Sequence, residues 1–276
     1  MKIVRFEHAS RQRWGVLNDD QVTSIDGADT FEEAVARSRS GAAGKTVPLS
    51  AVRLLPPVGR DAKILCAGLN YRAHLVEMKR AFPEYPSIFV RFANSLVGHG
   101  EPVARPFNSD CFDYEAELAV VIGKPARHVS VEDALEYVAG YTCMAENSVR
   151  DFQQHNTQAT PGKNFERSGA LGPWIVTADE VLDPGRLVLT GRLNGEVVQR
   201  SGTDDLIFSV PQLIAYLSSF TTLDPGDVIA TGTPEGVGMT RKPPRYLREG
   251  DVFEVDVSSI GTLANTVTNE RRTHVG

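Results

Sequence analysis

The segment 113–123, which reads DYEAELAVVIG, constrains the fold of this chain more than any other stretch. Carboxylates alternate with apolar side chains and then give way to an apolar run. Because successive side chains of a strand point to opposite faces, this pattern predicts a β-strand. Glu115 and Glu117 then share one face, roughly 6–7 Å apart at the backbone. Taken alone, the segment fits either a half-exposed strand with a polar outer face or a cation site.

A cation would solve the electrostatic problem that these two acids create. Two carboxylates at the edge of an apolar strip repel each other, and a buried acid without a partner is costly. Mg²⁺, Mn²⁺ and Ca²⁺ prefer carboxylate oxygens as ligands. A third acid, Glu146, follows the apolar segment 141–145. Three acids at or near strand ends would form one side of an open cation site, which leaves positions for water and substrate.

Further polar residues are candidates for catalysis, and each has a simpler alternative. His74 and Glu77 are three residues apart, so on a helix they share a face and the carboxylate can orient the imidazole as a base. An ordinary exposed pair has the same spacing. Lys163 lies in a loop with few other charges. Near the acids it would neutralise the site and donate to a developing oxyanion, whereas elsewhere it would be a solvent-exposed lysine.

Two further features suit the binding of an anionic ligand. Arg91 ends the predicted strand 87–91 and would bind a carboxylate ligand or pair with a structural acid. The segment 231–238, TGTPEGVG, is rich in glycine and hydroxyl groups, as backbone contacts with an anion require. It is not a Walker A loop, because it lacks the Gly-Lys-Ser/Thr ending.

The chain of 276 residues is long enough for a small domain followed by a larger one. The sequence pattern of residues 1–58 predicts a small α+β domain with short strands and a helix. The helix would start at a capping box, residues 30–33. Residues 59–276 predict a mostly β domain of many short strands. Its other signals are an Asn194-Gly195 hairpin turn, an amphipathic helix from Ser209 and a helix between Ser130 and Gly140.

Composition excludes several classes of function. The net charge is -6 and the basic residues are scattered, so we expect no nucleic-acid partner. No apolar run reaches membrane-spanning length, and the N-terminus lacks the apolar segment of a signal peptide. The three cysteines match no zinc spacing and no disulfide framework. These features predict a cytoplasmic protein without a membrane partner.

Several segments, in this order, resemble the fumarylacetoacetate hydrolase family in its small bacterial form. They include CAGLNYRAHLVE (66–77), DYEAELAVVIG (113–123), GYTCMAENSVRDFQ (140–153), PGKNF (161–165) and LDPGDVIATGTPEGVG (223–238). The resemblance implies a mixed β-sandwich and β-roll fold, a homodimer, and a Mg²⁺ or Mn²⁺ site, with Ca²⁺ as a further possibility. It assigns the metal ligands to Glu115, Glu117 and Glu146, although the family usually has Asp at the third position.

The resemblance also implies roles for the remaining candidates. His74 and Glu77 would be the catalytic pair, on a lid that orders over the substrate, and Lys163 matches the family lysine. Arg91 stands where relatives often carry Lys in a carboxylate-binding role. Gly232 and Thr233 would bind the carboxylate end of the substrate.

The leading hypothesis is metal-dependent hydrolysis of a C–C bond in a 2,4-dioxo acid. Such a substrate would be an acylpyruvate from aromatic-ring breakdown, for example fumarylpyruvate or maleylpyruvate. His74, oriented by Glu77, would deprotonate water, and Lys163 with the metal would stabilise the departing enolate. One alternative uses the same enolate for decarboxylation of an oxaloacetate-type acid or isomerisation of a 2-hydroxy-diene dicarboxylate. Another is a non-catalytic protein that binds a small oxo acid.

Overall fold

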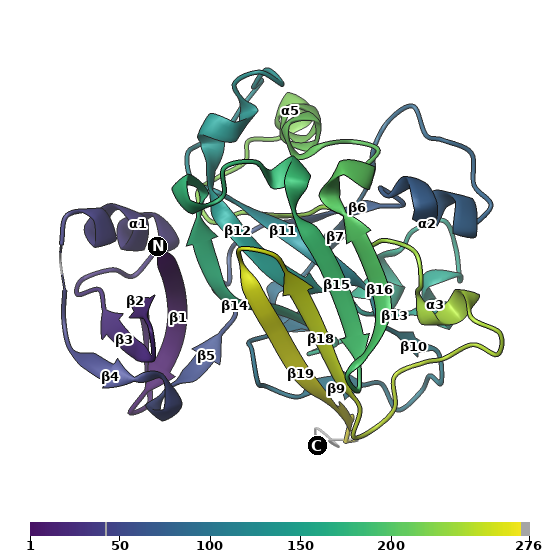
Figure 1. The fold of residues 1–276 in the computed structure, drawn as a ribbon, viewed down its shortest axis with the longest axis horizontal. Helices are drawn as coiled ribbons and strands as arrows, with labels where there is room; N and C mark the ends of the chain where they lie inside the picture. Colours follow the sequence, from purple (N-terminus) through teal and green to yellow (C-terminus); the bar gives the residue numbers. More distant parts are fainter. Residues whose placement is uncertain (42, 272–276) are drawn as a thin grey trace.

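A twelve-stranded sheet runs through the whole molecule in the computed structural model, which describes residues 1–41 and 43–271 (Figure 1). Its strands are β1 (Lys2–His8), β2 (Arg11–Asn18), β3 (Gln21–Ser24), β4 (Thr46–Pro48), β5 (Arg53–Leu55), β6 (Ile64–Gly68), β7 (Ser87–Arg91), β8 (Leu96–Val97), β11 (Ala116–Ile122), β12 (Val138–Ala145), β14 (Gly169–Thr177) and β17 (Val228–Ala230). They are ordered β4-β3-β2-β1-β14-β12-β11-β17-β6-β7, with β5 on β1 and β8 on β14.

A second sheet covers one face of the central strands. Its five strands are β9 (Val103–Arg105), β15 (Val188–Leu193), β16 (Glu196–Gly202), β18 (Val252–Val257) and β19 (Gly261–Asn269). Leu118 and Val120 of β11 share a buried cluster with Leu189 of β15 and Val255 of β18. Ala119, which points to the other face of β11, belongs to a separate cluster. The central strand is therefore buried on both faces, and the mostly β fold with two packed sheets is confirmed.

The N-terminal residues contain several short strands and one helix. Strands β1–β5 surround an apolar cluster of their own. Phe31 and Ala34 of helix α1 (Phe31–Arg39) belong instead to the cluster that includes Ala119 of the central strand. Thr30 and Glu33 form the predicted capping box. The unit is joined to the larger sheet by β1, whose first residues pair with β14.

The remaining helices are short. They are α2 (Arg72–Glu77), α3 (Arg150–Gln153), α4 (Thr160–Lys163) and α5 (Val210–Phe220). Helix α5 begins at Ser209 with a capping box, and Asn194 and Gly195 form the predicted turn with positive φ values of 54° and 81°. Within the described ranges, no helix is long and apolar enough to cross a membrane.

Two local predictions are wrong. The stretch after Ser130 forms only a 3₁₀ turn at Ala134–Tyr137 before β12 begins. Gly140 does not end a helix, because it lies inside β12, where a Cβ would be 2.2 Å from the Val176 carbonyl oxygen of β14. The predicted strand 113–123 is also divided, into β10 (Phe112–Asp113) and β11. At the start of β11 the Ala116 amide donates to the Gln199 side chain at 2.9 Å instead of to a neighbouring strand.

Candidate metal centre and active site

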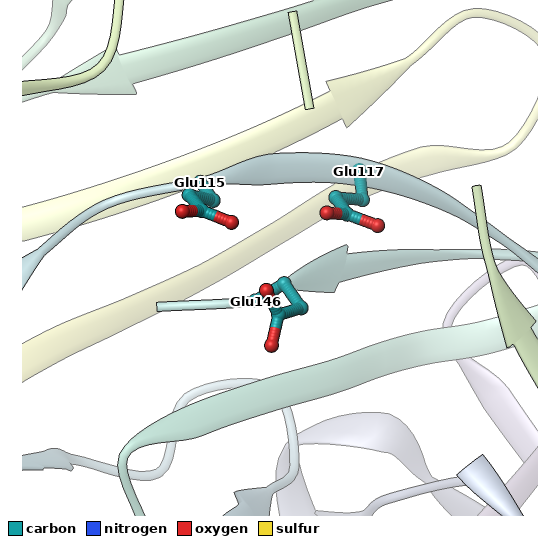
Figure 2. A group of neighbouring side chains, drawn as sticks. All are labelled: Glu115, Glu117 and Glu146. Atoms are coloured by element: carbon teal, nitrogen blue, oxygen red, sulfur yellow. The ribbon is translucent and has the colours of Figure 1, made fainter. Parts of the chain in front are cut away.

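Strand register brings the three predicted metal ligands together. Glu115 directly precedes β11, Glu117 is the second residue of β11, and Glu146 directly follows β12. In the antiparallel β11–β12 ladder Ala116 pairs with Ala145, and the Glu146 amide donates to the Glu115 carbonyl at 2.9 Å. Opposed residues of antiparallel strands share a face. The three carboxylates therefore converge on one face of the sheet (Figure 2).

The donor set fits a hard divalent cation. One oxygen from each of Glu115, Glu117 and Glu146 lies within 4.8 Å of the others, and all three residues are buried. Opposed oxygen ligands of Ca²⁺ are about 4.8 Å apart and those of Mg²⁺ about 4.2 Å apart, so small side-chain shifts suffice. Carboxylates alone, without His or Cys, favour Mg²⁺, Mn²⁺ or Ca²⁺ over zinc.

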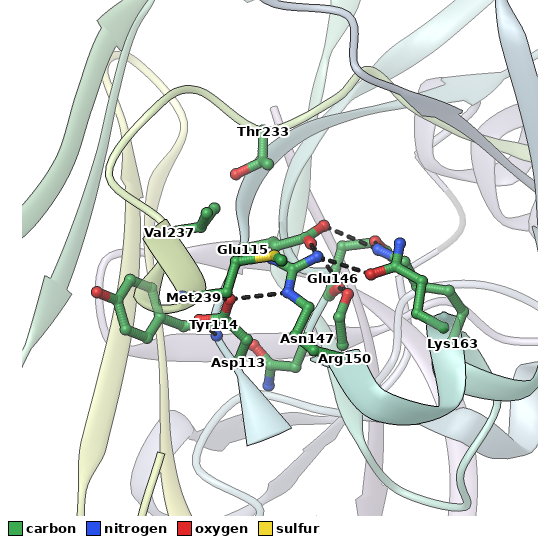
Figure 3. Close-up of polar contacts among 12 residues, drawn as sticks. Asp113, Tyr114, Glu115, Glu146, Asn147, Arg150, Lys163, Thr233, Val237 and Met239 are labelled. Carbon is green, nitrogen blue, oxygen red and sulfur yellow. Dashed lines mark hydrogen bonds and ion pairs between the residues drawn. The ribbon is translucent and has the colours of Figure 1, made fainter. Parts of the chain in front are cut away.

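Three buried cations surround two of the acids. Lys163 Nζ binds Glu115 at 2.8 Å and also contacts Glu146. Arg91 Nη1 binds the second oxygen of Glu146 at 2.8 Å. Arg150 Nη1 binds Glu115 at 2.5 Å (Figure 3). The predicted proximity of Lys163 to the acids is therefore present in the structure, and its ammonium is at the centre of the charge cluster.

Glu117 lacks such partners. Its carboxylate accepts one hydrogen bond, from the Gly232 amide at 2.9 Å, and forms no ion pair within the described part of the chain. Burial raises the pKa of Glu117 well above its usual range, and Glu146 and Glu115 raise it further. An added cation at this position would supply the missing countercharge.

The other two acids respond differently to burial. For Glu115, Arg150 and Lys163 outweigh burial and hold the pKa below its usual range. Burial raises the pKa of Glu146 to about 7 although Lys163 and Arg91 oppose it. Burial lowers the pKa of Lys163, but Glu115 and Glu146 outweigh this effect and raise it, so the lysine is a cation.

Arg150 is a site residue that the sequence patterns do not single out. It starts α3, four residues after Glu146, and its Nε binds Asp113 at 2.8 Å while its Nη1 binds Glu115. Its Nη1 also donates to Gln153 at 2.9 Å. Its position directly after a predicted ligand, in a segment carrying the family resemblance, is the signal that could have indicated it.

The loop after β17 connects the acids to the predicted catalytic pair. The Gly232 amide binds Glu117, and the Gly236 amide binds Glu77 at 3.0 Å. The amides of Gly238 and Met239 donate to Asp113, the partner of Arg150. This loop therefore donates backbone hydrogen bonds to carboxylates from three parts of the chain, and it accounts for the glycine-rich sequence.

His74 and Glu77 form the predicted pair on α2. His74 Nδ1 and Glu77 Oε2 are 2.9 Å apart, and Glu77 Oε1 accepts hydrogen bonds from Gly236 and from Thr240 Oγ1 at 2.7 Å. Burial alone would raise the pKa of Glu77, but its hydrogen bonds to His74, Thr240 and Gly236 lower it. The ionised Glu77 holds the imidazole by one nitrogen and leaves Nε2 for proton transfer.

The three predicted substrate-binding residues already bind protein atoms. Arg91 is 2% exposed and binds Glu146, Asn147, Ser95 and Ser168. Thr233 Oγ1 donates to the Ala116 carbonyl and accepts from Gln199, and Gly232 supports Glu117. In this geometry all three support the metal centre. For Arg91 this is the structural ion pair that the sequence left open as an alternative, and substrate contacts by these residues stay predictions.

Comparisons with known proteins agree with this architecture. Residues 63–268 match the family model of the fumarylacetoacetate (FAA) hydrolase C-terminal domain, and residues 1–57 match that of the Rv2993c-like N-terminal domain. The chain is 43% identical over 235 residues to oxaloacetate tautomerase Fahd2a, mitochondrial, from Rattus norvegicus, covering 85% of this chain and 75% of that protein.

Solved structures of similar fold include both isomerases and hydrolases. The 5-carboxymethyl-2-hydroxymuconate delta-isomerase from Mycobacterium smegmatis has a TM-score of 0.83 at 34% identity, over 99% of this chain and all of that one. The maleylpyruvate hydrolase from Sphingobium sp. SYK-6, in complex with manganese(II) ion and pyruvate, has a TM-score of 0.82 at 30% identity, over 98% of this chain and all of that one. The predicted resemblance is confirmed, and the chain belongs to the fumarylacetoacetate hydrolase family.

Proposed function

We propose that this protein is a divalent-metal-dependent enzyme that interconverts the keto and enol forms of an oxaloacetate-type 2-oxo dicarboxylate. The main support for the proposal is that one loop contacts both the acidic cluster and the His74–Glu77 pair. Residues 232–240 bind both Glu117 of the acidic cluster and Glu77 of the His74–Glu77 pair. A Lewis-acid site and an oriented base are the two requirements of enolisation. The 43% identity to oxaloacetate tautomerases supports the choice of substrate.

Each step of the proposed tautomerisation is assigned to particular residues. Glu115, Glu117 and Glu146 would hold the dication, which polarises the substrate's 2-oxo group when bound. His74 Nε2 accepts a proton from the adjacent carbon, while Glu77 stabilises the resulting imidazolium. Lys163 donates a hydrogen bond to the developing oxyanion. Return of the proton to oxygen completes the tautomerisation, so no other reactant is consumed.

Hydrolysis of an acylpyruvate is the second candidate, as predicted from the sequence. The similarity to the maleylpyruvate hydrolase structure favours it. His74 would then take its proton from water, and the resulting hydroxide would attack the distal carbonyl. The same lysine would stabilise the enolate of the leaving pyruvate. Decarboxylation of oxaloacetate would use the same groups without water.

A substrate panel distinguishes these activities. With Mg²⁺ or Mn²⁺ present, ultraviolet absorbance follows the enol of oxaloacetate, and a coupled assay follows pyruvate released from oxaloacetate, maleylpyruvate and fumarylpyruvate. We expect accelerated loss of the enol signal without pyruvate release. Pyruvate from the acylpyruvates alone would instead establish the hydrolase, and inactivity on every substrate would favour a binding protein.

Variants at histidine test the base directly. His74→Ala should abolish turnover, because Glu77 then has no imidazole to orient. His8→Ala, on β1 of the N-terminal unit, is the matched control and should retain full activity. Full turnover by His74→Ala would refute the assigned base.

We also propose that the protein is a cytoplasmic homodimer. The dimer is supported by β7, the last strand in the order of the large sheet, where Val90 and the following Phe92 are 39% and 54% exposed. Both residues also line the cavity described below, which would then lie beside the dimer interface. An edge strand with apolar side chains is a suitable surface for a second copy. Sedimentation velocity would measure the assembly, and a monomer at all concentrations would contradict it.

A further inference from the structure

A cavity of about 890 Å³ lies where the N-terminal unit meets the larger unit. Arg5 and residues 55, 56 and 58–60 line it from the N-terminal side, and the end of β7 and Arg167 line it from the other. Among its described lining residues there is no acid of the metal cluster, and neither Lys163 nor His74. Arg91 contributes to the wall while its guanidinium binds Glu146. The cavity is therefore distinct from the candidate metal centre, and its volume suits a small molecule.

The charged side chains around this cavity are mostly basic. Three of the six cations are neutralised by acids: Arg53 by Glu7 and Glu101, Lys63 by Asp224 and Asp227, and Arg91 by Glu146. The other three, Arg5, Arg60 and Arg167, form no ion pair with any residue that the structure describes. Glu166, which is exposed, is the one acid in the lining.

Arg5 and Arg60 are close enough to affect each other's charge. Burial lowers the pKa of Arg5, and the nearby Arg60 lowers it further, whereas Asp61 opposes them. Among the residues that the structure describes, Arg5 donates hydrogen bonds to two neutral groups, the Val58 carbonyl and the Gln12 side chain, each at 2.9 Å. A bound anion would relieve the repulsion between the two arginines, because guanidinium groups bind carboxylates and phosphates in a bidentate manner.

Arg167 provides a further cation away from the N-terminal unit. Its Nη2 makes one long contact, to the Pro102 carbonyl at 3.4 Å, and the side chain is partly exposed. Apolar residues also line the cavity, among them Leu55, Val58, Leu65 and Leu96. A cavity lined by both cations and apolar side chains suits an anion that has an apolar body.

We propose that this cavity is a second binding site, for a small organic anion that has an apolar body and at least two negative groups. Arg5, Arg60 and Arg167 bind its negative groups. Di- or tricarboxylates and phosphate monoesters share this chemistry. The site is independent of the reaction at the metal centre.

Calorimetric titration of the Mg²⁺-loaded protein tests the proposal with two probes. Tricarballylate represents the carboxylates and 1-naphthyl phosphate represents the phosphate esters. The test variant is Arg60→Glu/Arg167→Glu, which changes side chains outside the buried core. Arg186→Glu, an 85% exposed arginine outside the cavity lining, controls for surface charge. Glu117→Gln reports binding at the metal centre, and melting temperatures confirm that each variant is folded.

We expect a single class of site for at least one probe, and the preferred probe identifies the source of the negative groups. Affinity should fall on the order of 100-fold in Arg60→Glu/Arg167→Glu, roughly tenfold for each arginine replaced, because each binds the anion through a charged hydrogen bond. It should be unchanged in Arg186→Glu and in Glu117→Gln. The proposal is overturned by absence of saturable binding to the wild type, by equal affinity of the double variant, or by an equal loss in either control.

Discussion

The two sides of the acidic cluster differ in how their charge is balanced. Glu115 and Glu146 are bound by Lys163, Arg91 and Arg150, whereas among the described residues only the Gly232 amide donates to Glu117. The paired side has its countercharges in the folded chain and can form without a metal. The unpaired side has an excess carboxylate that a dication would neutralise. Fold stability and metal affinity should therefore depend on different glutamates, although all three belong to one proposed ligand set.

The largest effect on stability should come from breaking the paired side at Arg91. Arg91→Leu leaves the fully buried Glu146 without one of its two cations, and removing one partner of a buried pair costs about 3–5 kcal/mol. Denaturant unfolding of the chelator-treated protein measures this cost. Arg91→Leu/Glu146→Gln should recover part of it. A cost no larger than that of the exposed control Arg186→Leu would show that Arg91 does not balance the cluster.

Metal binding should stabilise the folded protein through Glu117, the glutamate without an ion pair among the described residues. Mg²⁺ or Mn²⁺ at 100 times its dissociation constant should stabilise the wild type by about 2.7 kcal/mol, because the ion binds only the folded state. In Glu117→Gln this stabilisation should disappear at the same concentration, since the uncompensated carboxylate has been removed. Thermal melting with and without chelator measures both proteins. An equal metal-dependent shift in the variant would contradict the role assigned to Glu117.

Neutralising single glutamates should have different consequences in the absence of metal. Glu115→Gln leaves Arg150 and Lys163 with one fewer anion, and we expect a loss of about 1–3 kcal/mol, typical of an unsatisfied buried group. Burial raises the pKa of Glu117 well above its usual range and so favours the uncharged acid when no metal is bound. Glu117→Gln then replaces one neutral group by another, and stability should be unchanged. Denaturant unfolding in chelator compares the two variants. Equal destabilisation would refute the division of the cluster.

The sequence identifies the residues of the acidic cluster, but it does not predict which residues surround them in the folded chain. The two-residue period places Glu115 and Glu117 on one face, and the three-residue spacing of His74 and Glu77 predicts their contact. The position of Glu146 opposite Glu115 depends on the register of β11 and β12, which includes an irregularity between Val121 and Ile122. Such non-local pairing has no signal in local periodicity.

The same limitation explains the two errors and the omitted arginine. The segment after Ser130 has helix-capping residues, but pairing with two neighbouring strands starts β12 at Val138 instead. The predicted strand 113–123 is divided after Asp113. The Asp113 carboxylate binds Arg150 and the amides of Gly238 and Met239, which are contacts with distant parts of the chain. Arg150 is unremarkable in the sequence, because its partners Asp113 and Glu115 lie far from it along the chain.

The Glu77 carboxylate is stabilised chiefly by hydrogen bonds. Its removal should have the smallest effect on stability of the changes considered. Its pKa is lowered from 4.5, with hydrogen bonds from Thr240 and the Gly236 amide besides the contact with His74. Because the unfolded state then binds more protons, this contribution to stability is present above pH 4.5 and is lost as the pH falls through the lower native pKa. The melting temperature of the wild type should exceed that of Glu77→Gln near neutral pH, and the difference should shrink on acidification. Glu33→Gln in the α1 capping box is the control for a carboxylate outside the site. A difference that grew as the pH fell would mean that Glu77 is protonated in the native protein and could not orient His74 as a base.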